Sequence, residues 1–282
     1  MRLPFVKMSG AGNDFVMIDH DLVGGLEDGI LSRLAADVCR RRHGVGADGL
    51  VTVRSLGGDR ARMVYLNADG SRAGMCGNAG RCASRYAFRK GWVGESLILE
   101  ADDGAHRAEI LADGVCLGMR DPQVCEGKIE LSHEGRVFVG ISLDTGVPHL
   151  VLWVDDVDRV DVEAVGRVFR FDPRFQPEGT NVNFAEVLGP SVLRLRTYER
   201  GVERETLACG TGAVAAAVGA CLQKGAGSPV ELRAPGGTLR VKYRVDGEGV
   251  RGVTLEGDAK VVYEGVLEYQ TRTATGAGKQ LT

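Results

Sequence analysis

Two short motifs, MCGNAGRC (residues 75–82) and ACGTGAVAAAV (residues 208–218), determine how this chain is interpreted. In each, a cysteine precedes small residues and then a stretch that favours a helix. Cys76 and Cys209 stand 133 residues apart, and the same offset relates GAD at 46–48 to GTN at 179–181. Landmarks that recur at one fixed offset predict a duplicated unit.

Short apolar runs separated by turn residues fill most of the chain around these motifs. The runs at 15–19, 49–55, 62–67 and 96–102 are rich in β-branched residues and predict strands. Glycine supplies 41 of 282 residues, about twice its average usage, which indicates many tight turns. Helical periodicity is clearest over 30–42, over 162–169 and after the two cysteines. Gly44 is the expected C′ residue of the first helix, whose Arg40, Arg41 and Arg42 are expected to be solvated charges.

These patterns predict an α+β fold of two pseudo-symmetric domains, each a curved, mostly antiparallel sheet or barrel around a central helix. Residues 1–125 are expected to form the N-terminal half and 126–261 the C-terminal half. The last strand, about 262–272, is expected to return to the first half. Clefts between domains are favoured ligand sites, so the active site is expected in the interdomain cleft. The tail TRTATGAGKQLT (271–282) is predicted to fray.

Composition narrows the class of protein. The net charge of −3 lacks the basic surplus typical of a nucleic-acid-binding protein. The N-terminus has no secretory signal pattern, and no run approaches the roughly 18–20 apolar residues of a membrane span. A cytoplasmic protein without nucleic-acid or membrane partners is therefore expected. Seven cysteines without a C-x-x-C pair, and only five histidines, argue against a disulfide framework and a metal site.

Cys76 and Cys209 are the candidate reactive residues. Backbone N–H groups at a helix start lack intrahelical partners and carry the positive end of the dipole, which favours a bound carboxylate. The same positive end is expected to lower the pKa of a thiol there. The ordinary alternative is a small, buried hydrophobic residue. We favour that alternative for the other five cysteines, which are Cys39, Cys82, Cys116, Cys125 and Cys221.

Further segments match one known family in order along the chain. They are residues 7–15, 44–49, 67–71, 75–82, 148–149, 179–183, 198–201 and 205–212. The chain thus resembles the diaminopimelate epimerases, cofactor-independent enzymes of lysine and peptidoglycan precursor synthesis. The resemblance implies interconversion of LL- and meso-diaminopimelate, no cofactor, no metal, and a homodimer.

The resemblance also implies roles for individual residues. One thiol of the pair Cys76 and Cys209 removes the α-proton while the other returns a proton on the opposite face. With the LL form, Cys209 abstracts and Cys76 donates. The remaining residues orient the thiols or adjust their protonation (His149, Glu199), hold the reacting carboxylate by backbone donors (Gly77, Asn78, Gly210, Thr211), or bind the distal part of the substrate (Asn13, Asn67, Asn181, Glu199, Arg200). The alternatives are a structural role for His149 and turn positions for the three asparagines.

Departures from the family pattern keep other functions open. Val147 stands where many relatives have asparagine, Gly49 where some have glutamine, and Ala79 where glycine is frequent. Proline racemase relatives usually carry histidine in place of Asn78, and phenazine-type isomerases usually lack the first cysteine. A histidine racemase is harder to exclude, because its departures fall in distal contacts such as Val147. A non-catalytic amino-acid-binding protein would have no need for two symmetric cysteines.

Overall fold

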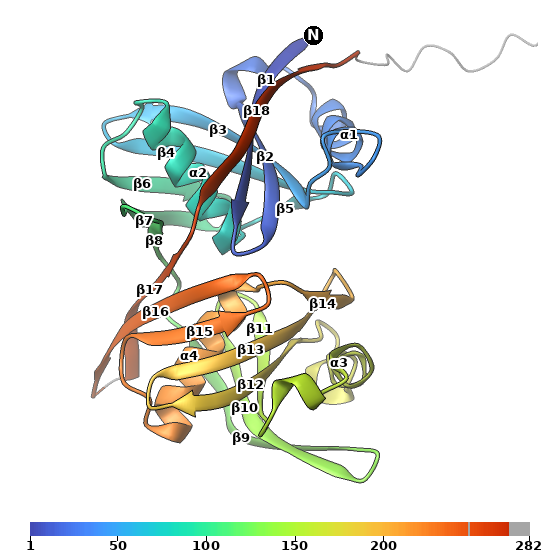
Figure 1. The fold of residues 1–282 in the computed structure, drawn as a ribbon, viewed down its shortest axis with the longest axis vertical. Helices are drawn as coiled ribbons and strands as arrows, with labels where there is room; N and C mark the ends of the chain where they lie inside the picture. Colours follow the sequence, from blue (N-terminus) through green and yellow to red (C-terminus); the bar gives the residue numbers. More distant parts are fainter. Residues whose placement is uncertain (248, 271–282) are drawn as a thin grey trace, which may run out of the picture.

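The structure is a computed structural model that describes residues 1–247 and 249–270, mostly strands curved around two helices (Figure 1). The first half holds β1 (Arg2–Gly10), β2 (Asn13–Asp19), α1 (Asp28–Cys39), β3 (Gly49–Gly57), β4 (Arg60–Asn67), β5 (Arg72–Ala73), α2 (Gly77–Arg89), β6 (Ser96–Ala101), β7 (Gly104–Ile110) and β8 (Val115–Gly118). The second half holds β9 (Gln123–His133), β10 (Arg136–Asp144), β11 (Pro148–Trp153), α3 (Val162–Arg170), β12 (Asn181–Gly189), β13 (Val192–Glu199), β14 (Arg204–Thr206), α4 (Gly210–Lys224), β15 (Val230–Ala234), β16 (Gly237–Asp246) and β17 (Gly249–Gly257). The strand β18 (Lys260–Glu268) follows.

The two halves repeat one order of strand pairing. The parallel pairs β2–β3 and β4–β6 of the first half correspond to β11–β12 and β13–β15 of the second. The other pairs are antiparallel, as in the hairpins β3–β4 and β12–β13. Because α2 and α4 begin at equivalent places in this order, the predicted pseudo-symmetric α+β fold is confirmed. The predicted division near residue 125 stays a proposal.

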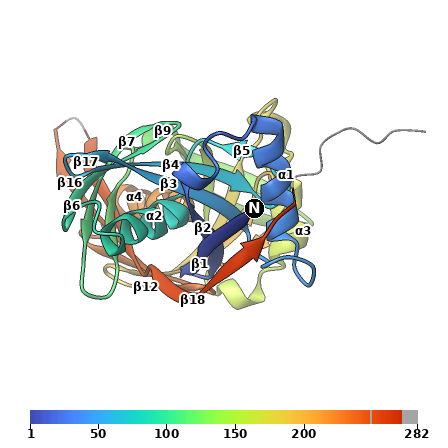
Figure 2. The ribbon, with the colours of Figure 1, turned by 90° about the horizontal axis from the view of Figure 1, so that it is seen from above.

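The helices α2 and α4 are enclosed by the strands of their own halves. Strands contact α2 from β1 to β4 and from β6 to β8, and the view from above shows them around it (Figure 2). Small residues recur in both helices because larger ones at these positions would meet the strands. An added Cβ at Gly80 would lie 3.0 Å from Leu117 Cδ2 of β8, and one at Gly219 would lie 2.9 Å from Ile141 Cγ2 of β10. The small residues therefore allow the strands to pack closely around each helix.

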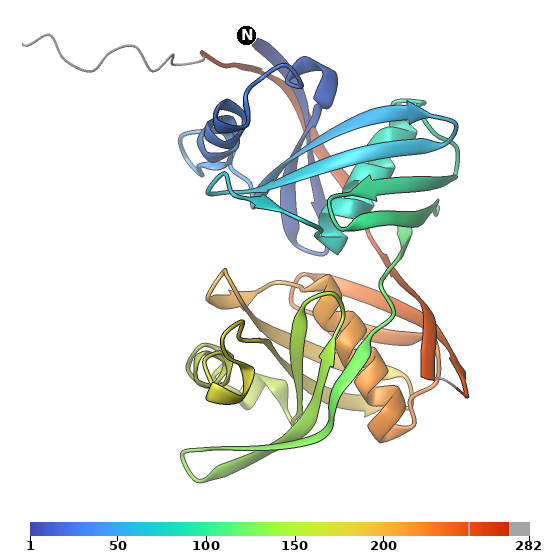
Figure 3. The ribbon, with the colours of Figure 1, turned by 180° about the vertical axis from the view of Figure 1, so that it is seen from behind.

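Strands also join the halves to each other. β8 pairs with β17 across the junction, and β18 lies antiparallel to β1 (Figure 3). This second pairing is equivalent to β9 on β10, so β18 covers the edge of β1 that the duplication would leave open. The β1–β2 turn inserts Ala11 into the core of the second half. An added Cβ at Gly12 would lie 2.8 Å from Gly236 Cα, so the halves touch closely at this turn.

Most predicted elements agree with the structure. The predicted strands at 15–19, 49–55 and 62–67 fall within β2, β3 and β4, the one at 96–102 extends one residue beyond β6, and the helix over 162–169 is α3. The expectation of a helix to residue 42 is wrong, because α1 ends at Cys39 and Arg40 leaves the helix with extended dihedral angles. Gly44 instead closes the next turn by donating to Arg40 O at 2.7 Å. The predicted fraying of 271–282 lies outside the described residues.

Candidate active site

The helices α2 and α4 start at the junction of the two halves and point their N-termini at one place (Figure 3). An added Cβ at Gly210 would lie 3.7 Å from Gly77 Cα. The Leu255 side chain packs against both glycines, 3.3 Å and 2.9 Å from Cβ atoms built on Gly77 and Gly210. Two sets of free N–H groups and two positive dipole ends therefore converge, as an anion site requires.

Cys76 and Cys209 are the N-cap residues of these two helices. Cys209 Sγ accepts the Gly212 N–H at 3.4 Å and lies 3.4 Å from Thr211 Oγ1. Cys209 is 8% exposed, whereas Cys76 is partly exposed. Among the other cysteines, Cys39 and Cys82 are buried as expected, and Cys116 and Cys221 are partly buried. The expectation of burial is wrong for Cys125, which lies in the exposed first part of β9.

Burial dominates the protonation of both thiols. Burial, followed by the neighbouring Glu199 charge and with a smaller contribution from Cys76, raises the pKa of Cys209 to about 12. Burial also raises the pKa of Cys76, while the N–H groups of Ala79 and Asn78 lower it. The expectation that the helix start lowers the thiol pKa is wrong here, because desolvation outweighs the helix dipole.

His149 is fully buried, and one of its two ring nitrogens has a hydrogen-bond partner. Asn183 Nδ2 donates to His149 Nδ1 at 3.1 Å and to Leu150 O at 3.0 Å, and Thr197 Oγ1 donates to Asn183 Oδ1 at 2.9 Å. An acceptor at Nδ1 places the proton on Nε2. His149 Nε2 is buried without a hydrogen-bond partner among the described residues. The strand pair β11–β12 thus presents an uncommitted N–H donor.

Protonation of His149 should make stability fall in acid. Burial, then the Arg200 charge, lowers its pKa to about 3, against roughly 6.5 in an unfolded chain. Between these values the unfolded state binds one more proton, so unfolding becomes easier as the pH falls. We expect the wild type to lose about 1.4 kcal/mol per pH unit more than His149→Gln between about pH 6 and 4. Urea denaturation across this pH range measures the unfolding free energy of both proteins. An equal pH dependence of this free energy in the wild type and His149→Gln would contradict the prediction.

Asn181 connects the residue that follows β13 to the start of β11. Asn181 Oδ1 accepts the Arg200 N–H at 2.9 Å, and its Nδ2 donates to Pro148 O at 3.0 Å. Arg200 Nη1 donates to Glu178 O at 3.2 Å, and the guanidinium makes no ion pair within the part of the chain that the structure describes. Glu199 accepts from Thr206 Oγ1 at 2.9 Å, and burial raises the pKa of its carboxyl. The Arg200 guanidinium thus keeps donors that are not committed to a carboxylate of the described residues.

Asn78 connects the two halves through its side chain. Its Nδ2 donates to Asn13 Oδ1 at 2.5 Å and to Ala208 O at 3.3 Å. Asn13 Nδ2 in turn donates to Asp48 Oδ2 at 3.0 Å, and Asn67 Nδ2 donates to Ser71 Oγ at 3.0 Å. The predicted asparagines are therefore all engaged with protein atoms, and substrate binding would require exchange of some of these bonds.

An ion-pair network that the sequence pattern did not indicate supports Asn13. Arg41 Nη2 lies 2.7 Å from Asp14 Oδ1 and 2.9 Å from Asp48 Oδ1. Lys7, which is buried, lies 2.7 Å from Asp14 Oδ2 and also donates to Gly46 O. Arg41 is exposed as expected, with 61% of its side chain accessible, but it follows the end of α1 and pairs with two carboxylates there. Lys7 and Asp14 lie inside a family-like segment, which was the available signal.

Tyr65 occupies the space beside Gly49. A Cβ at Gly49 would lie 2.4 Å from Tyr65 Cε2 and 2.7 Å from Leu66 O. Burial, followed by the nearby Cys76 and Glu199 charges, raises the pKa of the Tyr65 hydroxyl. The ring therefore borders the site where a longer residue 49 would project.

Ala79, the other departure near the site, is fully buried in α2.

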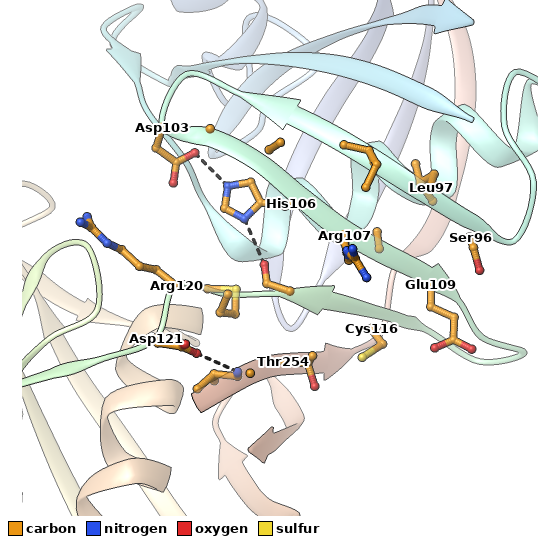
Figure 4. Close-up of a pocket in the computed structure, with 18 of the residues that line it drawn as sticks. Ser96, Leu97, Asp103, His106, Arg107, Glu109, Cys116, Arg120, Asp121 and Thr254 are labelled. Atoms are coloured by element: carbon orange, nitrogen blue, oxygen red, sulfur yellow. Dashed lines mark hydrogen bonds and ion pairs between the residues drawn. The ribbon is translucent and has the colours of Figure 1, made fainter. Parts of the chain in front are cut away.

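A groove of about 1060 Å³ runs along another face of the junction (Figure 4). His106 bridges its wall, with Nε2 3.0 Å from Asp103 Oδ1 and Nδ1 3.0 Å from Gly118 O. Asp121 accepts the Val253 N–H at 3.1 Å and links the connecting segment to β17. Neither Cys76 nor Cys209 lines this groove, so we do not assign the substrate to it.

Residues 1–247 and 249–270 contain neither a membrane-spanning helix nor a cluster of metal ligands. In that range, no helix is long and apolar enough to cross a membrane. No group of three or more His, Cys, Asp or Glu side chains there could hold a metal ion. The convergent helix starts therefore remain the strongest candidate site.

Comparison with known proteins gives one consistent result. The profile of the diaminopimelate epimerase family matches residues 5–124 and 141–262. A diaminopimelate epimerase from Aquifex aeolicus is 40% identical over 284 residues, which cover 95% of this chain and 100% of the relative. One from Archaeoglobus fulgidus is 40% identical over 281 residues, covering 95% and 97%.

Solved structures share the fold at low sequence identity. A PhzF-family phenazine biosynthesis protein from Bacillus anthracis has a TM-score of 0.72 at 17% identity, covering 95% of this chain and 100% of that one. A hydroxyproline epimerase from Agrobacterium vitis has a TM-score of 0.70 at 15% identity, covering 94% and 91%. At these identities the likeness extends to the fold alone.

Proposed function

The chain belongs to the diaminopimelate epimerase family, and from this premise we propose that it interconverts LL- and meso-diaminopimelate by proton transfer at one α-carbon. One observation carries the mechanism: two cysteines cap two buried helices whose starts meet at the junction of duplicated halves. Curated relatives at 40% identity over nearly the full chain support the substrate. They favour this reading over a histidine racemase.

Inversion requires a base on one face of the α-carbon and an acid on the other. A thiolate at Cys209 takes the α-proton of the LL form, and the Cys76 thiol donates its proton to the opposite face. The product is the meso form, with Cys209 now a thiol and Cys76 a thiolate. The reverse reaction exchanges the roles. Each turnover therefore moves one proton in and one proton out, with no change in oxidation state.

The carbanion needs stabilisation that two thiols alone do not give. We assign it to the backbone N–H groups of Gly77, Asn78, Gly210 and Thr211, which would hold the reacting carboxylate. One such preorganised donor is typically worth about 2.7–4 kcal/mol in the transition state. The close contact of the halves at the β1–β2 turn supports exclusion of water, which strengthens these interactions.

His149 and Glu199 are proposed to orient the thiols and adjust their protonation. The uncommitted Nε2–H of His149 supports a donor role, and its low pKa keeps it neutral. Glu199 accepts a hydrogen bond from Thr206, and its negative charge raises the pKa of both thiols, which supports a role in adjusting their protonation. Arg200 has free guanidinium donors for the distal carboxylate, which suits bidentate binding. Asn13, Asn67 and Asn181 are proposed to contact the distal amino acid moiety.

The test is proton NMR of the reduced protein with LL-diaminopimelate in D₂O and no pyridoxal phosphate. We expect growth of meso product that carries deuterium at the inverted α-carbon. Exchange with histidine in place of diaminopimelate would contradict the substrate and retain the two-thiol mechanism. No exchange with any amino acid would leave an amino-acid-binding protein as the function.

Location and assembly stay predictions. A cytoplasmic protein is consistent with a family of biosynthetic enzymes, and cell fractionation would measure it. The homodimer that the family resemblance implies is tested by light scattering of the purified chain. A monomer at micromolar concentration would contradict it.

A further inference from the structure

Arg81 is a fully buried arginine in the first turn and a half of α2. Its Nη2 donates to Asn78 Oδ1 at 2.8 Å, its Nη1 to Gly77 O at 3.4 Å, and its Nε to Asp258 O at 3.3 Å. All three acceptors are neutral. No carboxylate lies within 4 Å of the guanidinium among residues 1–247 and 249–270. A buried cation of this kind normally has a negative partner.

The surroundings of Arg81 allow it little movement. A Cβ at Gly257 would lie 3.0 Å from both Cζ and Nε of the guanidinium. Burial lowers the pKa of Arg81, but a guanidinium stays protonated in proteins. The positive charge is therefore held in place behind the start of α2.

Three groups near Arg81 can carry negative charge: Cys82, Asp258 and Cys76. Burial raises the pKa of Cys82 to about 12, so this thiol stays neutral. The Asp258 carboxylate accepts the Ala11 N–H at 2.6 Å and lies 3.0 Å from Lys260 Nζ, so it already has partners. Cys76 is the remaining group. Arg81 is the cation whose charge acts on its thiolate.

The second half has no counterpart of this arginine. The 133-residue offset that relates Cys76 to Cys209 places the buried Val214 opposite Arg81. The groups that face Cys209 are Glu199 from β13, Thr211 and the Gly212 N–H from α4, and Cys76. Cys76 is faced by Glu199 and by Arg81, and Tyr65 of β4 borders it. The duplicated site is thus electrostatically unequal.

We propose that Arg81 is a positioning residue that makes Cys76, and not Cys209, the first of the two thiols to ionise. Its guanidinium supplies the positive charge behind the Cys76 helix start, and its bond to Asn78 Oδ1 sets the amide that joins the two halves. If the proposed function holds, the earlier ionisation of Cys76 determines which substrate the resting enzyme deprotonates. The enzyme with its thiolate at Cys76 is the form that removes a proton from the meso substrate.

Alkylation of the two thiols tests this without substrate. The reduced wild type is treated with iodoacetamide from pH 6 to 10, and peptide mass spectrometry follows each cysteine separately. We expect Cys76 to reach half of its maximal rate about one pH unit or more below Cys209. In Arg81→Met the Cys76 midpoint should rise by about one unit, which is a tenfold slower alkylation below the midpoint. Cys209 should change by less than about threefold, and Arg81→Lys should restore much of the Cys76 profile.

Arg85→Met is the matched control, because Arg85 lies one turn further along α2 and donates at 2.7 Å to Leu111 O and Gly114 O. Its removal should leave both alkylation profiles unchanged. A folded Arg81→Met with an unshifted Cys76 midpoint overturns the proposal. If neither Arg81 variant folds by circular dichroism, the wild type decides: Cys76 ionising first supports the proposal, and Cys209 ionising first or with it overturns the proposal. Failure of the NMR assay would overturn the substrate and leave this result intact.

Discussion

Replacing either Cys76 or Cys209 by alanine is expected to stop formation of meso product from LL-diaminopimelate. A positioned general acid or base typically contributes about 10²–10⁴-fold, and inversion needs both partners in every turnover. Both residues cap helices that are held by packing along their length, so the fold should survive each change. Proton NMR in D₂O measures the loss. Deuterium in unreacted LL substrate is followed as well, since one remaining thiol can exchange a proton with retention.

Cys125→Ala is the matched control, because Cys125 is an exposed cysteine in β9 away from both helix starts. It should keep wild-type activity. If Cys76→Ala or Cys209→Ala forms meso product at more than about a tenth of the wild-type rate, a base other than these thiols acts and the two-thiol mechanism fails.

Gly212→Ala is expected to cost both activity and stability. The added Cβ would lie 2.3 Å from Asn183 Oδ1, so the Asn183 amide must move. That movement breaks the bonds from Thr197 to Asn183 and from Asn183 to His149. Leaving such buried groups unpaired costs about 1–3 kcal/mol of unfolding free energy. We expect an activity loss of about 10²-fold as well, because His149 and the Cys209 helix start are both displaced.

Urea denaturation and the NMR assay measure the two effects of Gly212→Ala. Gly29→Ala in α1 is the control, because no atom lies within 4 Å of a Cβ built there. It should stabilise the protein by up to about 1 kcal/mol, as alanine favours a helix over glycine. Equal stability and activity of Gly212→Ala and wild type would show that the Asn183 amide is not held as described.

The fold was predictable because the duplication left local signals in each half. Cysteine followed by small residues predicts both buried helix starts, and alternating apolar runs predict the strands at 15–19 and 49–55. The end of α1 was not predictable, because Arg41 leaves the helix to pair with two carboxylates from other segments. A local sequence pattern does not indicate ion-pair partners that come from distant segments of the chain.

Part of the candidate site was predictable for the same reason. Cys76, Cys209 and His149 lie in short motifs whose residue types indicate their chemistry. The sequence does not indicate roles for Arg81, Asn183 and Tyr65, because the contribution of each to the site depends on the residues packed around it. Arg81 lies within the first motif, but only its complete burial beside neutral acceptors distinguishes it from a surface arginine.

The duplicated architecture, the pairing of two cysteines with two helix starts, and the family are all predictable from the amino-acid sequence. These follow from local spacing and from residues that repeat at one offset. The tertiary structure alone decided the protonation of the site: burial raises both thiol pKa values, holds His149 neutral and leaves Arg81 beside Cys76. The physical reason is that desolvation and Coulomb interactions depend on distances between segments far apart in the chain, which spacing along the sequence does not contain.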